Sequence, residues 1–168
     1  FIDILANDIR QHSNDESLPF HAAATRVLLQ WLGYDLDSVH FIDMRDRGID
    51  AWVDTEYGLD IFQFKTHEPS AIGTLDLSTF DGQGIRDLER SKIFLLHESP
   101  SNTQNKELKQ LLYLWSSIIR SHKLQDSSIP LPVTLHLVIL GDELTSQASL
   151  EFNTFKASNT QNQLVDGI

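Results

Sequence analysis

The sequence predicts an α/β fold, in which helices flank a mixed β-sheet made of a hairpin and a later strand. Apolar and polar residues alternate along 48–55 and 59–66, as they do in paired strands. A separate apolar run, rich in β-branched residues, follows much later at 133–140. A hairpin and a distant strand separated by helical patterns imply a mixed sheet with helices packed on it.

The first part of the chain is predicted to be helical over residues 2–12 and again over 20–32. Apolar side chains recur in both segments at helical spacing. Pro19 stands where the second helix begins, and Gly33 stands where helices commonly end. A short extended segment is expected next, at 39–43.

The two alternating strands are expected to form a hairpin with a two-residue turn at 57–58, which reads Tyr-Gly. This turn places Asp50 opposite Lys65 and Trp52 opposite Gln63. Because paired residues share a face, Asp50, Gln63 and Lys65 are expected together on one face of the sheet. The opposite face is predicted to be the core face and carries Ile49, Ala51, Val53, Phe62 and Phe64.

The rest of the chain is predicted to be helical at 84–97, 106–123 and 146–157, with the buried strand 133–140 before the last helix. The helix at 106–123 has the clearest apolar stripe. Residues 68–80 are expected to form an irregular excursion.

The composition suits a single domain over residues 1–168, with 40% hydrophobic and 22% charged residues. The chain has no cysteine, which excludes disulfide scaffolds, thiolate metal sites and thiol nucleophiles and fits the cytoplasm. Its apolar runs are shorter than the roughly 18 residues of a membrane span, so no membrane partner is expected. Because the chain begins at Phe1 instead of Met, we expect a fragment of a longer protein.

The charge balance argues against a strong nucleic-acid partner. The chain carries 24 acidic and 13 basic residues, a formal net charge of −11. Such a chain repels phosphate backbones at long range. We therefore expect this domain alone to bind DNA poorly and with little sequence preference.

The polar face of the hairpin nevertheless has the residue types of a phosphodiester-cleaving metal site. A carboxylate such as Asp50 with a nearby carbonyl oxygen binds a hard cation such as Mg²⁺, which polarises a phosphodiester and generates hydroxide. Gln63 offers a neutral oxygen, and Lys65 can neutralise charge in the transition state. The alternative is structural, because an Asp opposite a Lys on a hairpin is commonly a cross-strand ion pair.

Three segments carry a recognisable set of motifs: a helix ending in leucines and Gly-Tyr, a Gly-Ile-Asp strand, and a strand ending in Q-x-K. They read Val27-Leu28-Leu29-Gln30-Trp31-Leu32-Gly33-Tyr34, Asp46-Arg47-Gly48-Ile49-Asp50 and Ile61-Phe62-Gln63-Phe64-Lys65. Together they resemble the PD-(D/E)xK restriction-endonuclease-like superfamily, in its Mrr-like branch with the QxK variant. Within that branch the chain is most similar to the amino-terminal nuclease-like domain of abortive-infection phage-resistance proteins. The motif core covers residues 20–66.

The resemblance implies a restriction-endonuclease-like sheet core and an endonuclease that hydrolyses DNA, with RNA as an alternative, in prokaryotic phage defence or restriction. It implies that Asp50, Gln63 and the backbone carbonyl of Phe64 hold Mg²⁺ or Mn²⁺. It also implies that Lys65 is the catalytic lysine. Further domains or subunits of the parent protein are expected partners, and a homodimer is one possible assembly.

One position departs from the family pattern. Family members often carry a Glu near the start of the helix, where this chain has His21. Asp50 is then the only carboxylate at a motif position. Asp46 and Asp54 lie near it in the predicted hairpin and could compensate, and Trp52, on the same face, could contact a substrate or pack under a loop.

This departure and the net charge leave two other functions open. The first is a catalytically inactive nuclease-fold module that binds nucleic acid or a partner protein. The second is a plain interaction domain in which Asp50 and Lys65 are merely paired. The seven histidines show no HxH or HExxH spacing, so we expect surface or core positions for most of them, although His21 at the helix start could bind metal or hold a water as an auxiliary site residue.

Overall fold

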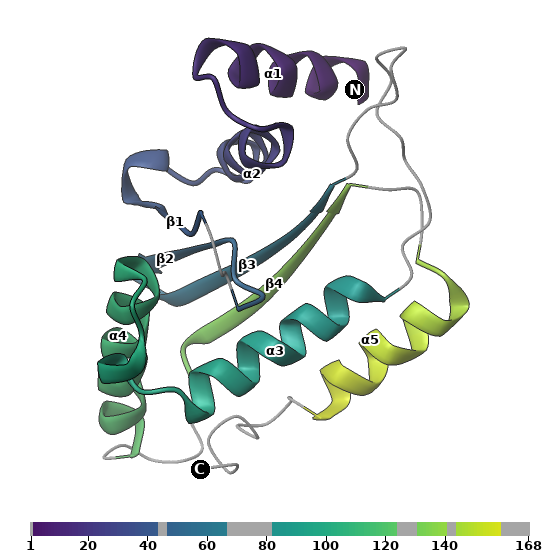
Figure 1. The fold of residues 1–168 in the computed structure, drawn as a ribbon. Coiled ribbons are helices and arrows are strands. Elements are labelled where there is room, and N and C mark those ends of the chain that lie inside the picture. Colours follow the sequence, from purple (N-terminus) through teal and green to yellow (C-terminus); the bar gives the residue numbers. More distant parts are fainter. Residues whose placement is uncertain (1, 44–46, 67–81, 124–130, 141–143, 159–168) are drawn as a thin grey trace.

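A computed structural model describes residues 2–43, 47–66, 82–123, 131–140 and 144–158. Within them lie five α-helices and one four-stranded mixed sheet (Figure 1). The predicted α/β class, a mixed sheet flanked by helices, is confirmed. The predictions for residues 68–80 and for Asp46 lie outside the described residues.

The helices and strands occur in the predicted order. The helices are α1 (Ile2–Asp15), α2 (Phe20–Trp31), α3 (Gln83–His97), α4 (Lys106–Lys123) and α5 (Ser146–Ser158). The strands are β1 (His40–Phe41), β2 (Ala51–Thr55), β3 (Gly58–Thr66) and β4 (Val133–Leu140). Short 3-10 turns at Leu36–Ser38 and Pro100–Asn102 precede β1 and α4.

The sheet has the strand order β1-β2-β3-β4. The pairs β1/β2 and β2/β3 are antiparallel, whereas β4 pairs in parallel with β3. The parallel pair requires a crossover, which α3 and α4 supply between β3 and β4. The pairing of β3 with β2 ends at Phe62, so the Q-x-K segment is held by its pairing with β4.

Helices cover both faces of the sheet, with α1 and α2 on one side and α3, α4 and α5 on the other (Figure 1). On the α2 side, Phe62 and Phe64 pack with Leu29. On the opposite side, Trp52 and Ile61 pack with apolar residues of α3 and α4. The prediction of one core face and one polar face is therefore wrong for most of the hairpin, because both faces are core. Gln63 and Lys65 lie at the end of the second face where β2 begins and β3 finishes, whereas Asp54 is exposed near the other end of β2.

The hairpin turn lies one residue earlier than predicted. Thr55 pairs with Gly58, so the loop is 56–57 and each pair is shifted by two residues from the prediction. The Thr55 hydroxyl donates to the Gly58 carbonyl at 2.9 Å. Gly58 has a φ of +139°, and a Cβ there would lie 2.3 Å from the carbonyl oxygen of Pro132, just before β4. The approach of β4 thus requires glycine at the start of β3, and the two-residue shift leaves the paired side chains of β2 and β3 on their predicted faces.

The strand β2 begins at Ala51 instead of residue 48, because the chain turns at Gly48, where φ is +83°. Ile49 therefore packs in the cluster around Trp52, although the alternation predicted it beside Val53. This turn brings the Asp50 segment against α3.

Candidate functional site

Asp50, the residue before β2, is fixed by backbone hydrogen bonds to both neighbouring segments. Its backbone N–H donates to the Phe62 carbonyl at 2.8 Å, and its carbonyl accepts from the Ile42 N–H at 2.9 Å. Its carboxylate oxygen Oδ2 accepts from the Phe64 N–H at 2.6 Å and from Gln63 Nε2 at 2.7 Å. The carboxylate is thus oriented by β3.

Gln63 is buried beside this carboxylate, with 3% of its surface exposed. Its Nε2 also donates to the Phe64 carbonyl at 3.1 Å, so one amide group contacts both the Asp50 carboxylate and that carbonyl. Without a cation between these groups, the opposite amide orientation would place Oε1 against two acceptors, so Nε2 faces both of them. Oε1 itself is buried and has no hydrogen-bond donor among the described residues. The structure thus brings Asp50, Gln63 and the Phe64 carbonyl together.

Lys65 lies two residues further along β3, on the same face as Gln63 by strand alternation. The ion pair that the hairpin register predicted would join it to Asp50. The structure instead pairs its Nζ with Asp87 Oδ2 of α3, at 2.5 Å. In the observed register, Gln63 replaces Lys65 as the neighbour of Asp50.

Asp87, which the sequence patterns did not single out, is a carboxylate that is only 5% exposed. Its other oxygen accepts from Arg90 at 2.8 Å and from Gln83 at 3.1 Å. Burial raises the pKa of Asp87, but the hydrogen bond and charge of Lys65 and the hydrogen bonds from Arg90 and Gln83 outweigh it. The pKa therefore lies below its ordinary value of 3.8. The available signal was an acidic residue on the same helical stripe as the buried Gly84 and Ser91, at intervals of three and four residues.

Small residues let α3 approach the Asp50 segment closely. A Cβ on Gly48 would lie 2.1 Å from the backbone oxygen of Asp87. Ser91 Oγ lies 2.5 Å from the Gly48 carbonyl oxygen and 2.9 Å from that of Asp87. A Cβ on Gly84 would lie 3.1 Å from Lys65 Cγ. The helix is therefore packed directly against the residues that the motifs single out.

A cavity of about 370 Å³ opens at Asp50 on the side of α2. His21, at the start of α2, lines it together with Asp50. Asp43 and Arg26 line it as well, and both were missed. Asp43 ends the predicted strand 39–43, and pairing of that strand with β2 is the signal that could have found it.

Trp52 and Asp54, which the sequence suggested as a substrate contact and a compensating carboxylate, lie away from this cavity. Trp52 is 1% exposed, and its ring stacks on His40 with centroids 3.7 Å apart. It packs in the core, so a contact with substrate is excluded in this arrangement. Asp54 is exposed and lies opposite Leu59, four residues beyond Asp50 and hence about 13 Å along the strand. It cannot compensate for the missing carboxylate.

The donor set at Asp50 suits a hard divalent cation. It comprises the Asp50 carboxylate and the Phe64 carbonyl; Gln63 presents Nε2 to both, so its unpartnered Oε1 would join them as a third oxygen ligand only after the amide turns. The described residues contain no group of three His, Cys, Asp or Glu placed to hold a metal ion. Among the described residues at motif positions, Asp50 is the one carboxylate that such a cation would meet, and Mg²⁺ in such sites takes further ligands from substrate phosphate.

Comparison with protein-family models, curated proteins and solved structures finds no match for this chain. Among the described helices, none combines the length and the hydropathy needed to cross a membrane.

Proposed function

We propose that this chain is a metal-dependent endonuclease domain of the PD-(D/E)xK type that hydrolyses phosphodiester bonds in DNA. The observation that carries the proposal is the convergence of the Asp50 carboxylate, the buried Gln63 amide and the Phe64 carbonyl at one point of the sheet. The helix and strand order and the resemblance of the three motifs support it.

In the proposed reaction, one set of residues would bind the cation and Lys65 would stabilise the transition state. Asp50 and the Phe64 carbonyl would hold the cation, and Gln63 would bind it through Oε1 once the amide, whose Nε2 faces both of them in the structure, has turned. When bound, Mg²⁺ polarises the phosphodiester and lowers the pKa of a water molecule. Lys65, held by Asp87, supplies positive charge for the transition state. Asp43 and His21 line the cavity on the other side of Asp50, where they can contact water or substrate.

The test is cleavage of DNA and RNA with Mg²⁺ or Mn²⁺. Asp50→Asn keeps an acceptor for the Phe64 N–H, and Lys65→Met keeps the apolar stem. Each should lower the cleavage rate at least about 100-fold. Asp54→Asn, an exposed acid on the same strand, should cut like the wild type. Equal activity in all variants, or none in the wild type with either metal, would refute the proposal.

A second candidate is a nuclease-fold module that binds nucleic acid without cutting it. The observation in its favour is the single carboxylate in the donor set, with His21 where family members often carry Glu. This candidate predicts nucleic-acid binding in EDTA and no cleavage with either metal.

The biological setting that we propose is prokaryotic phage defence or restriction in the cytoplasm, as the resemblance implies. With a net charge of −11, the domain alone would hold DNA weakly. Further domains or subunits of the parent protein would then supply most of the affinity.

A further inference from the structure

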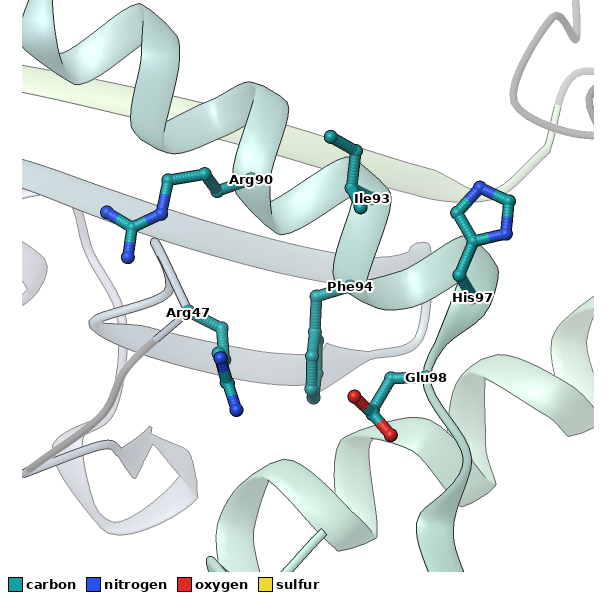
Figure 2. Close-up of a pocket in the computed structure, with 6 residues that line it drawn as sticks. All are labelled: Arg47, Arg90, Ile93, Phe94, His97 and Glu98. Carbon is teal, nitrogen blue, oxygen red and sulfur yellow. The ribbon is translucent and has the colours of Figure 1, made fainter. Parts of the chain in front are cut away.

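A groove lined by two arginines lies beside the Asp50 segment, on the α3 side of the molecule. It consists of two cavities of about 250 and 260 Å³. Their shared lining residues are Arg47, Phe94 and Glu98. Arg90, Ile93 and His97 of α3 complete the first cavity, as Figure 2 shows. We call the two cavities together the arginine groove.

The local charge of the groove differs from that of the chain. The whole chain has 24 acidic and 13 basic residues, but the walls of the groove contain two arginines and one carboxylate, Glu98. Glu98 accepts a hydrogen bond from the Ser99 N–H at 3.2 Å. Figure 2 shows Glu98 and Arg47 on opposite sides of the Phe94 ring. The first turn of α4 borders the second cavity, which adds the positive end of a helix dipole.

Both arginines can bind a ligand. Arg90 is 60% exposed and binds Asp87 Oδ1 through Nη1, so one end of its guanidinium is held while other N–H groups remain available. Arg47 is exposed, and it forms no ion pair with the acidic residues of the described ranges. Guanidinium groups that converge on one groove match the paired oxygens of a phosphate.

The position of the groove connects it to the candidate site. Arg47 precedes Asp50 by three residues, so their Cα atoms are at most about 11 Å apart. That distance is comparable with the separation of nearby phosphates along one nucleic-acid strand. On the other wall, Asp87 holds both Arg90 and Lys65. A nucleic-acid strand with one phosphate at Asp50 could therefore place a neighbouring phosphate in the groove.

We propose that the arginine groove binds the phosphodiester backbone of a nucleic-acid strand next to the reacting phosphate, through Arg47 and Arg90. Because the backbone is the ligand, binding does not depend on base sequence. The inference deepens the proposed function and rests on it for the position of the reacting phosphate. Binding in the groove, by contrast, needs neither metal nor cleavage.

The experiment measures binding of labelled oligonucleotides in EDTA, where no metal-dependent cleavage occurs. The probes are duplex DNA and single-stranded RNA of equal length. Arg47→Asn removes the charge and keeps a residue that tolerates the left-handed backbone, since φ at this position is +56°. Arg90→Gln keeps a donor for Asp87. The matched control is Arg86→Gln, another exposed arginine of α3 that is paired with a carboxylate, Glu151, and does not line the groove.

Each groove variant should weaken binding roughly 3–10-fold on both probes and lower the slope of log affinity against log salt by about one. Arg86→Gln should bind like the wild type. Glu98→Gln should act in the opposite direction and tighten binding. If the groove variants match Arg86→Gln, or if the wild type does not bind either probe at low salt, the inference is overturned. Arginine-dependent binding without cleavage would instead refute the endonuclease and leave the groove as a binding site.

Discussion

Replacing Asp87 by Asn removes the carboxylate on which Lys65, Arg90 and Gln83 converge. The bond from Lys65 is charge-assisted, a class worth about 1.5–3 kcal/mol. Breaking a fully buried ion pair costs about 3–5 kcal/mol, but here Lys65 is 24% exposed and its released ammonium can reach water. We therefore expect Asp87→Asn to lower the free energy of unfolding by about 2 kcal/mol at neutral pH.

Urea denaturation followed by circular dichroism measures this loss. The matched control is Glu89→Gln, which removes an exposed acid from the same helix and should change stability by less than about 0.5 kcal/mol. Equal stabilities of the two variants would refute the idea that Asp87 anchors Lys65.

The pH dependence of folding stability tests the role of Asp87 independently. The pKa of Asp87 is lower in the folded chain than its ordinary value of 3.8, because Lys65, Arg90 and Gln83 outweigh the effect of burial. Its ionisation therefore stabilises the fold above pH 3.8, and this stabilisation is lost as the pH falls through the lower, folded-state pKa. The difference in stability between wild type and Asp87→Asn should shrink on acidification. A difference that stays constant would contradict this assignment.

Two further predictions concern the backbone and Tyr34. Gly33→Ala adds a Cβ with no atom within 4 Å at a φ of +92° and should cost about 1 kcal/mol. In Gly48→Ala, a φ of +83° is combined with a Cβ only 2.1 Å from the Asp87 carbonyl oxygen, so the substitution should cost at least about 3 kcal/mol. Similar urea midpoints for Gly33→Ala and Gly48→Ala would contradict the close approach of α3. Burial and the hydrogen bond to Asp60 raise the pKa of Tyr34 from 10.0 to about 12, so the stabilisation by its phenol is present below pH 10.0 and lost as pH rises toward about 12. Tyr34→Phe should abolish this loss and the tyrosinate absorbance that develops near pH 12, and unchanged absorbance would refute the assignment.

The elements with strong internal periodicity were predictable from the sequence. Residues 106–123 and 133–140 match α4 and β4 because an apolar stripe or a compact apolar run specifies each of them locally. The hairpin register was missed because the position of its turn depends on contact between Gly58 and Pro132, 74 residues later in the chain. Local turn propensity contains no information about that contact.

At the candidate site, too, features set by local alternation were predictable from the sequence, and features set by long-range packing were not. Alternation along the two strands correctly placed Asp50 and Gln63 close together, and the two-residue slip did not disturb this because the period of a strand is two. The partner of Lys65 could not be read from the hairpin, since Asp87 reaches it from a helix that packs across the sheet. Trp52 looked available for substrate because alternation does not reveal that α3 and α4 cover its face.

Binding of a divalent cation at Asp50 is the most direct test of the proposed metal-dependent cleavage. The measurement is the anomalous density of Mn²⁺ in crystals of the domain grown with a short phosphorothioate oligonucleotide. We predict a peak within coordination distance of the Asp50 carboxylate and the Phe64 carbonyl, with Gln63 Oε1 turned toward it, and no peak in Asp50→Asn. Absence of density at Asp50 in the wild type, or an unchanged peak in Asp50→Asn, would contradict the proposed metal-dependent chemistry.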